Sequence, residues 1–501
     1  MKMLAFDLGA SSGKICLGSF NGEALDLEVI RRFENNAVFV RDDIFWDVLR
    51  IFNELKEGIA EGLNVANQIR CIGLDSFSND FGLLDRDGHL ISQVYSYRDN
   101  RTKRNADKIY AMMSRERIHR LSGNQNALFP TLMQLAAMRL EAQDYLINGS
   151  SRLLFLPDLF IYFLTGAIGS EYTISSVSQL LDFDSRDWNQ EILATFGIPC
   201  SLFAPIVPAG SRVGQITDDA LVQGKKIDVI AVCEHDTASA FLAAPFGEEA
   251  IIISSGTWSL VGIETPRHII NEYTFKHNIA NEGGYPGHHR MLKNVMGLWL
   301  IQECNRVYSK GRREYSSAEL MELAAAQKPF RSLINPNSER FFSPGAMPQK
   351  IASYCAERGQ AHPQTMGEVI RCIVESLALQ YRLVIEELEA VSGARFAHIN
   401  IVGGGSSNSF LNQCVADATG RRVVAGPKEA TAIGNLLVQL IAQGEIASVR
   451  EGRQLVRQSF PVELFEPAAP AGWDERYTAY KQMIATEGQA PPPAGNPLER
   501  R

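Results

Sequence analysis

The opening residues of the chain alternate short apolar runs with small or polar turns. Residues 3–8 form an apolar run that contains one Asp, residues 9–13 read GASSG, and in residues 14–20 Ile and Leu alternate with small or polar neighbours. A period of two is typical of strands, and glycine with serine is typical of the turn between them. The pattern therefore predicts a hairpin, followed by a second turn at Asn21-Gly22.

The order of elements predicted for the first half recurs in the second half. Residues 250–264 again predict strand, small-residue loop and strand. Residues 398–420 predict strand, glycine loop and helix, as residues 227–242 do, and residues 46–66 carry apolar positions at helical spacing. Two α/β domains of similar build explain this recurrence better than one sheet does.

The recurrence sets the expected domain limits. We expect an N-terminal domain over residues 1–246 and a C-terminal domain over residues 247–488. Residues 489–501 are rich in Pro and are predicted to be a disordered tail.

Composition and charge exclude several classes of protein. Of 501 residues, 45% are hydrophobic and 21% are charged, which is typical of a globular protein. Lys and Arg number 49 against 57 Asp and Glu, for a net charge of −8, and no basic run predicts a nucleic-acid partner. An anionic ligand would therefore need local devices, namely backbone N–H groups, a metal ion and a few placed cations.

The cysteines and the apolar segments indicate a cytoplasmic protein without a membrane partner. The eight cysteines form no CxxC pair, so free thiols are expected. The N-terminal apolar run is too short for a signal peptide, and no run is long enough to span a membrane. A monomer and a homodimer both remain open.

The loop GASSGK at residues 9–14 resembles two well-known motifs and fits neither. A P-loop needs one more residue between the glycines and a Ser or Thr where Ile15 stands. A GxSxG hydrolase elbow, with Ser11 as nucleophile and His235 in the triad, needs a helix where the pattern predicts a strand. The loop is then either an ordinary turn or a phosphate-binding turn. Asp7 favours phosphate binding, because a carboxylate in an apolar strand needs a partner such as Mg²⁺.

A second candidate group lies where a predicted strand ends and a helix begins. Asp236 could cap this helix. Alternatively it could be a general base, because a helix N-terminus favours the ionised carboxylate. His235 has no second His at ligand spacing, so it is predicted to pack or to contact substrate rather than to bind a metal. His288 and His289 are interpreted as surface or substrate-rim residues.

Two further loops of small residues are candidates for ligand binding. The loop at residues 254–257 (SSGT) holds the same place in the second half as GASSGK in the first. Gly403, Gly404 and Gly405 fail the dinucleotide-binding pattern because Asn408 replaces its third glycine. They still let a flat group lie against the backbone.

Together these motifs resemble the FGGY carbohydrate kinase family over almost the whole chain. The segments that carry the resemblance, in the family's order, include DLGASSGK (7–14), YRDNRT (97–102), LPDLFIYFLTG (156–166), HDTASA (235–240), SSGTWSL (254–260), NEGG (281–284), LKNVMGLWL (292–300), IVGGG (401–405) and AGPKEATAIGN (425–435). The resemblance implies an actin-like (ribonuclease H-like) ATPase fold, in which two similar α/β domains enclose a cleft that holds ATP and a sugar.

The resemblance also implies roles for individual residues. The first phosphate loop would comprise Ala10, Ser11, Ser12, Gly13 and Lys14. The rest of the ATP site would comprise Thr257, Gln302, Gly403 and Gly404, with Asp7 on Mg²⁺. The sugar would meet Ser78, His235, Asp236, Thr237 and Asn294, and Asp236 would be the base.

The reaction that the resemblance implies transfers the γ-phosphate of ATP to the C1 hydroxyl of a ketose, L-rhamnulose, in the breakdown of rhamnose. Two departures from the family pattern bear on this expectation: in the segment 75–81 (DSFSNDF), Phe77 replaces a Trp and Ser78 replaces a Gly, and Lys14 stands where Arg is usual. L-Fuculose or L-xylulose therefore stays open as substrate. A non-catalytic regulator that binds sugar and nucleotide is the alternative from another class. Cys355 and Cys372 resemble a cysteine pair in some relatives but are interpreted as thiols.

Overall fold

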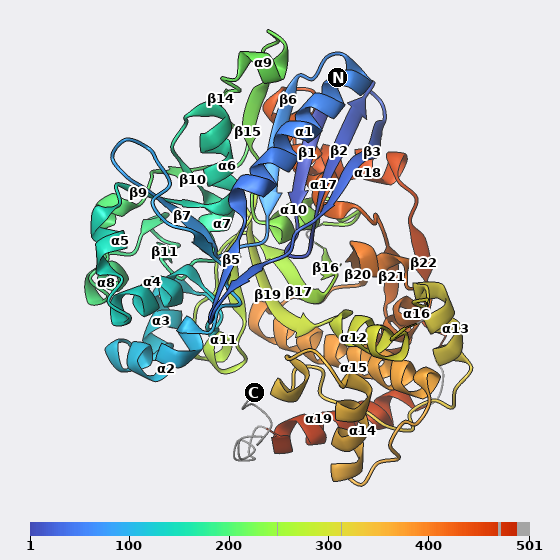
Figure 1. The fold of residues 1–501 in the computed structure, drawn as a ribbon. Coiled ribbons are helices and arrows are strands. Elements are labelled where there is room, and N and C mark those ends of the chain that lie inside the picture. Colours follow the sequence, from blue (N-terminus) through green and yellow to red (C-terminus); the bar gives the residue numbers. More distant parts are fainter. Residues whose placement is uncertain (248, 312, 469–471, 488–501) are drawn as a thin grey trace.

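The computed structural model describes residues 1–247, 249–311, 313–468 and 472–487, and two sheets form the centres of two lobes (Figure 1). The first sheet has six strands in the order β14 (Ser211–Gln215), β15 (Asp228–Ala231), β6 (Cys71–Ser76), β1 (Lys2–Leu8), β2 (Ser12–Phe20) and β3 (Leu25–Glu34). The second has seven, in the order β18 (Ala280–Gly283), β19 (His289–Met296), β17 (Trp258–Thr265), β16 (Ala250–Ser255), β20 (His398–Val402), β21 (Arg422–Ala425) and β22 (Glu463–Phe465).

The two sheets share one topology. The order β3-β2-β1-β6-β15-β14 in the first sheet corresponds to β19-β17-β16-β20-β21-β22 in the second. Directions agree as well: β1 and β16 each pair antiparallel with the next strand and parallel with β6 or β20, and each sheet ends on an antiparallel strand. This confirms the recurrence predicted from the sequence, with β18 as an addition to the second sheet.

The N-terminal hairpin forms as its pattern predicts. β1 and β2 pair antiparallel from Lys2 opposite Ser19 to Leu8 opposite Gly13. Gly13 is required there because a Cβ on it would lie 2.1 Å from the Phe33 ring. A strand follows the GASSG loop, so the strand–turn–helix of a hydrolase elbow is absent at this loop.

Helices cover the sheets and form a further layer beside the first lobe. The helices that precede β15 are α1 (Val48–Ala66), α2 (Arg101–Met112), α3 (Arg115–Ser122), α4 (Thr131–Leu140), α5 (Asp144–Gly149), α6 (Leu156–Thr165), α7 (Tyr172–Ser176), α8 (Gln190–Thr195) and α9 (Asp219–Val222). Short strands lie among them: β4 (Val38–Val40), β5 (Asp43–Trp46), β7 (Phe81–Leu84), β8 (Val94–Tyr95), β9 (Arg152–Phe155), β10 (Ser170–Glu171), β11 (Leu181–Asp182), β12 (Asp187–Trp188) and β13 (Ile206–Val207).

The second lobe is built on its longest helix, α15 (Met366–Ser392). A capping box of Thr365 and Glu368 begins this 27-residue helix, and Gly393 ends it with a φ of 70°. Its buried side packs with the sheet in one apolar core. The other helices of this lobe are α11 (Glu272–Lys276), α12 (Trp299–Tyr308), α13 (Ser317–Ala325), α14 (Met347–Glu357), α16 (Ser409–Thr419), α18 (Val449–Ser459) and α19 (Trp473–Glu487).

Two topologically equivalent helices, α10 (Asp236–Leu242) and α17 (Ala430–Ala442), pack against each other between the lobes (Figure 1). A Cβ on Gly434 would lie 1.8 Å from the Ser239 carbonyl oxygen, so glycine permits this close approach. α17 also contacts β1 and β6 of the first sheet, and Gln439 donates to the Leu4 carbonyl at 2.9 Å. One apolar core therefore spans both lobes.

Three expectations concern the chain as a whole. All eight cysteines are free thiols, as expected, including Cys355 and Cys372. Among the described residues, no helix combines the length and the apolar character that crossing a membrane requires. The predicted tail, 489–501, lies outside the described residues.

Candidate active site

The ends of β1, β6 and β15 bring the predicted acidic residues to one edge of the first sheet. The Phe77 amide donates to the Leu8 carbonyl at 3.1 Å, and the Ser76 amide donates to the Glu234 carbonyl at 2.8 Å. Parallel strands that end together place their following residues side by side. Asp7 and Asp236 therefore share this edge.

Asp7 is the carboxylate that the apolar run of β1 carries. Its Oδ2 lies 3.7 Å from Lys14 Nζ, and its side chain is 13% exposed. Burial raises the pKa of Asp7 to about 6; the Lys14 charge opposes this, and the charges of Asp236 and Glu429 add to it. Carboxylates that repel one another in a buried site are the oxygen ligands a divalent cation takes. The residues present therefore fit Mg²⁺.

Asp75, on β6 directly beside Asp7, is a site residue that the sequence did not reveal. Its Oδ2 accepts a hydrogen bond of 2.6 Å from Asn435 Nδ2 of α17, while its buried Oδ1 has no partner in the described structure. Burial and the nearby Asp7 raise the pKa of Asp75 well above its usual range. Asp75 thus adds a further acidic group to this edge.

Asp236 is the first residue of α10 and does not cap it in the usual way. The N-cap position belongs to His235, which makes no side-chain cap hydrogen bond. Asp236 Oδ1 accepts from the Thr237 amide at 2.5 Å and from Thr237 Oγ1 at 3.0 Å. The Asp236 side chain is 30% exposed. Oδ2 is therefore placed to accept a proton from a ligand.

Buried polar side chains accept hydrogen bonds from the backbone of the turn before α10. The Glu234 amide donates to Glu171 Oε2 and the His235 amide donates to Thr173 Oγ1, each at 3.2 Å. Burial raises the pKa of Glu171 to about 7. Burial raises the pKa of both Glu234 and Asp158 well above the usual range, and the charge of Glu171 adds to this in each case. These groups hold the loop that presents His235 and Asp236.

Lys14 of the first loop reaches across to the second lobe. Its Nζ donates to Glu429 Oε2 at 2.6 Å, and Arg32 Nη2 pairs with the other oxygen at 3.1 Å. Glu429 is the N-cap of α17. Sequence reasoning missed Glu429, although the segment AGPKEATAIGN that contains it carried part of the resemblance.

The glycines at 403–405 pack against the second small-residue loop. A Cβ on Gly403 would lie 3.1 Å from the Ser255 carbonyl, and one on Gly405 would lie 2.0 Å from Ser255 Oγ. Gly404 is exposed, and nothing lies within 4 Å of a Cβ built on it. The structure thus brings Gly403 and Gly404 beside the loop that contains Thr257, and an open backbone surface lies at Gly404.

Gln302 and Asn294 flank this loop. The Trp299 amide at the start of α12 donates to the Thr257 carbonyl at 3.2 Å, and Gln302 is exposed one turn further along the helix. Asn294 lies on β19, four residues after Arg290, and side chains on a strand alternate between faces. Arg290 contacts His235, so Asn294 lies on the face of β19 that turns toward the His235–Asp236 turn.

Aromatic side chains surround the segment that departs from the family pattern. Phe77 packs with Trp46 at a ring distance of 4.8 Å and with Tyr97 at 6.0 Å. The charge of Asp236 is among the causes that raise the pKa of Tyr97, after burial. Ser78, half-buried, accepts a hydrogen bond of 2.9 Å from Asn79 Nδ2. The segment therefore lies near Asp236, and the rings of Trp46 and Tyr97 pack against its Phe77.

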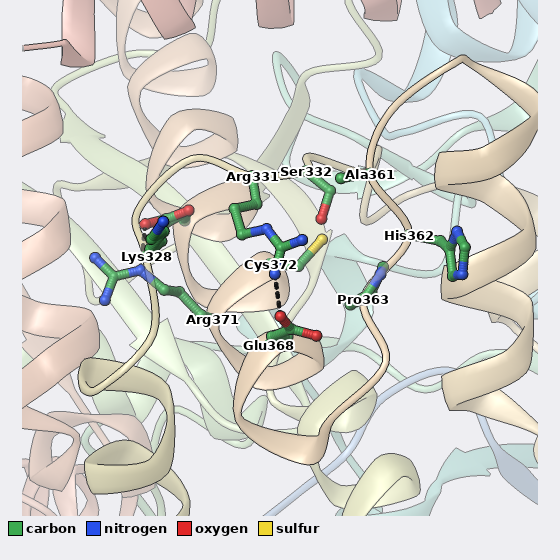
Figure 2. Close-up of a pocket in the computed structure, with 10 residues that line it drawn as sticks. Lys328, Arg331, Ser332, Ala361, His362, Pro363, Glu368, Arg371 and Cys372 are labelled. Atoms are coloured by element: carbon green, nitrogen blue, oxygen red, sulfur yellow. Dashed lines mark hydrogen bonds and ion pairs between the residues drawn. The ribbon is translucent and has the colours of Figure 1, made fainter.

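A small pocket at the N-terminal half of α15 contains none of the predicted site residues (Figure 2). Its two arginines already have partners: Arg331 pairs with Glu368, and Arg371 Nε donates to Glu375 at 2.7 Å. This pocket is therefore separate from the candidate site.

The interpretation of His289 as a surface or rim residue is wrong. His289 is 5% exposed and packs against Phe183 and His268. Burial lowers its pKa to about 4, with a contribution from His268. His289 lies within β19, and its side chain is enclosed by the segments that cross this strand.

The fold and the site define a two-lobed sugar kinase, and comparison with known proteins gives the family. Residues 2–243 match the N-terminal domain of the FGGY family of carbohydrate kinases, and residues 251–443 match its C-terminal domain. The chain belongs to this family, and it has the actin-like ATPase fold that the resemblance implied.

Curated relatives cover nearly the whole chain. It is 38% identical over 483 residues to a rhamnulokinase of Bacteroides thetaiotaomicron, covering 96% of this chain and 99% of the relative. It is 40% identical to a rhamnulokinase of Yersinia pestis, covering 93% and 95%.

Solved structures agree in fold. A ligand-bound xylulose kinase from Lactobacillus acidophilus matches with a TM-score of 0.82 at 14% identity, covering 98% of this chain and 99% of the other. A Plasmodium falciparum glycerol kinase with ADP matches with a TM-score of 0.76 at 15% identity and the same coverage.

Proposed function

We propose that this enzyme transfers the γ-phosphate of ATP to the C1 hydroxyl of L-rhamnulose, giving L-rhamnulose 1-phosphate and ADP in the breakdown of L-rhamnose. The choice of sugar is carried by the rhamnulokinase relatives, which match over more than nine-tenths of the chain. The chemistry is supported by one arrangement: Asp236 is near enough to Asp7 for its charge to raise the pKa of Asp7, Asp7 lies 3.7 Å from Lys14, and one carboxylate oxygen of Asp236 is unused by Thr237.

In this proposal each predicted residue has a physical task. Asp236 accepts the proton of the C1 hydroxyl, whose oxygen then attacks the γ-phosphorus as the bond to ADP breaks. The amides and hydroxyls of residues 10–13, with Lys14 and Thr257, bind the phosphates. Gln302, Gly403 and Gly404 line the nucleotide, and His235, Thr237, Ser78 and Asn294 surround the sugar.

We propose that Asp7 holds Mg²⁺ with the phosphates of ATP. Bound there, the ion neutralises charge on the transferring phosphoryl group. Lys14 must then exchange its contact with Glu429 for the phosphates, and the 2.6 Å contact shows that its side chain reaches between the lobes. We also propose the domain limits 1–246 and 247–488, which the family-model matches support. Cytoplasmic location, and a monomer or homodimer, stay predictions.

A coupled ADP-release assay with Mg²⁺ and ATP tests the proposal across L-rhamnulose, L-fuculose, L-ribulose, L-xylulose and D-xylulose. The highest kcat/KM is expected for L-rhamnulose. If no ketose is phosphorylated, the kinase proposal is wrong.

A second candidate substrate is another ketose, such as L-fuculose or L-xylulose. The observation that favours it is Ser78, which stands where the family pattern has glycine and adds a half-buried side chain with a hydroxyl next to Phe77. A preference for one of these sugars in the same assay would select this alternative.

A further inference from the structure

His235 is contacted by a buried ion pair that comes from the other lobe. His235 follows β15 of the first sheet, whereas Glu282 and Arg290 lie opposite each other on β18 and β19 of the second. Their exposed fractions are 5% for His235, 2% for Glu282 and 1% for Arg290. The three side chains therefore meet in the interior, and only a small part of the His235 ring is exposed.

The distances decide which nitrogen of the ring carries the proton. Arg290 Nη2 lies 3.1 Å from His235 Nδ1, within hydrogen-bonding distance and geometry. A guanidinium has only donors, so Nδ1 must accept and cannot carry hydrogen. Glu282 Oε2 is 3.4 Å from the same nitrogen but accepts no well-formed hydrogen bond from it. A neutral His235 is therefore the tautomer with hydrogen on Nε2.

Arg290 is itself held in place. Its Nε donates to the Gly283 carbonyl at 2.8 Å, and its Nη2 lies 3.0 Å from Glu282 Oε2. The guanidinium also lies 5.7 Å from the centre of the Phe241 ring. Burial raises the pKa of Glu282, but the Arg290 charge opposes burial, and the pKa lies below its usual range. An ionised Glu282 thus balances the charge of Arg290.

The other ring nitrogen faces the proposed base. His235 Nε2 lies 3.5 Å from Asp236 Oδ1, whose oxygen already accepts from the Thr237 amide and hydroxyl. An N–H at Nε2 would therefore have its donor capacity available for a ligand bound beside Asp236. The charged groups that face the ring are Asp236 on one side and Glu282 with Arg290 on the other.

We propose that Arg290, balanced by Glu282, is a positioning residue that fixes His235 as the Nε2–H tautomer, so that Nε2–H donates to an oxygen of the sugar next to the hydroxyl that Asp236 deprotonates. The sugar contact rests on the proposed function, whereas the tautomer does not. Without Arg290, Glu282 becomes the nearest partner of Nδ1, and the proton moves to that nitrogen. The ring would then present a lone pair to Asp236 and to the sugar.

The tautomer can be read directly in the sugar-free protein. Long-range ¹H–¹⁵N spectra of protein labelled with ¹⁵N-histidine resolve the two ring nitrogens, and the spectrum of His235→Gln assigns the His235 signals. In the wild type we expect a protonated Nε2 and an unprotonated Nδ1. In Arg290→Met the pattern should reverse, and in Arg290→Lys, which keeps a donor, it should be retained. The proposal would be overturned by a protonated Nδ1 in the wild type, or by a His235 ring that keeps the wild-type protonation of its two nitrogens in Arg290→Met.

Kinetics test the consequence for the reaction. Arg290→Met should lower kcat/KM for the ketose by about 10²-fold, with the loss mainly in kcat and the KM for ATP unchanged. Arg290→Lys should retain most of the wild-type kcat/KM for the ketose. Retention of wild-type kcat/KM in Arg290→Met would overturn the role in positioning.

Arg453 provides the matched control. It is also a buried arginine, 6% exposed, with Nη2 at 2.7 Å from Glu264, and it donates to the Phe241 carbonyl. Arg453→Met removes a comparable ion pair and should leave the ring tautomer unchanged. If it shifts the tautomer as Arg290→Met does, the effect is general destabilisation and the proposal is wrong. If Arg290→Met does not fold, the wild type and Arg290→Lys still decide the tautomer.

Discussion

The two sheets have the same strand order and directions, yet they present different chemistry at equivalent strand ends. At the ends of β1 and β6 the first sheet places Asp7 and Asp75. At the end of β16, and one residue after the end of β20, the second sheet places Ser255 and Gly403. One topology thus yields an acidic edge suited to a metal ion and a proton acceptor, and an open backbone edge suited to a nucleotide.

The sharpest contrast is between two acids at the starts of equivalent helices. Glu429, the N-cap of α17, pairs with both Lys14 and Arg32. Asp236, the first residue of α10, forms no ion pair with Lys or Arg in the described part of the chain. A base must be free to take a proton, so Asp236 is available for the catalytic role that we propose, whereas Glu429, one position earlier relative to its helix, makes a contact between the lobes.

The largest expected effect separates these two acids. Asp236→Asn removes the proton acceptor and should lower kcat by about 10²–10⁴-fold, while calorimetry shows nucleotide affinity within about twofold of the wild type. Glu429→Gln, at the start of the equivalent helix, should lower kcat by no more than about tenfold. Equal losses in the two variants, or wild-type activity in Asp236→Asn, would contradict the division of roles.

A second effect concerns the acidic edge and pH. Because burial raises the pKa of Asp7 from 3.8 to about 6, the folded protein binds more protons than the unfolded chain between these values. Stability without metal should therefore fall as pH rises across this window. Asp7→Asn should flatten the fall, raising the unfolding free energy at pH 7.5 by about 1–3 kcal/mol while abolishing activity.

Urea unfolding between about pH 3 and pH 8, a range that includes the pKa of Asp7 in both the unfolded and the folded state, measures this effect. Glu28→Gln is the control, since Glu28 is an exposed carboxylate on β3 of the same sheet. If the unfolding free energy of Asp7→Asn depends on pH as that of the wild type does, the pKa of Asp7 is not raised in the folded protein.

A third effect tests the open backbone edge of the second lobe with two neighbouring glycines. Gly405→Ala would press its Cβ to 2.0 Å from Ser255 Oγ and should cost about 1–3 kcal/mol of stability. Gly404→Ala meets nothing within 4 Å, so stability should stay within about 0.5 kcal/mol. If the nucleotide lies there, the KM for ATP rises about tenfold in Gly404→Ala with the KM for sugar unchanged. An unchanged KM for ATP would move the nucleotide away from Gly404.

The smallest effect concerns the sugar. Ser78→Gly removes the side chain that departs from the family pattern and should shift the kcat/KM ratio toward L-rhamnulose by about tenfold. Ser78→Ala, which keeps Cβ and loses only the hydroxyl, separates shape from hydrogen bonding. If both variants rank the ketoses by kcat/KM as the wild type does, Ser78 does not determine which sugar the enzyme prefers.

Local patterns in the sequence predicted the elements well. The period-two runs and small-residue loops gave both hairpins, and the glycines at 403–405 lie between a strand and a helix as expected. The contacts between the lobes could not be predicted from the sequence, because no local pattern links Asp75 to Asn435, 360 residues away. His289 was misplaced for the same reason, since segments distant in sequence bury it.

The position of α17 on the first sheet has a consequence for dissecting this protein. Ile433, Leu436 and Leu440, from the segment after residue 247, share one apolar core with Met3, Ala5 and Ile230. A fragment that stopped at residue 246 would expose this face of its own sheet to water. The two halves that match the family models are therefore not independent folding units, and neither half is expected to stay folded and soluble unless the other is supplied with it.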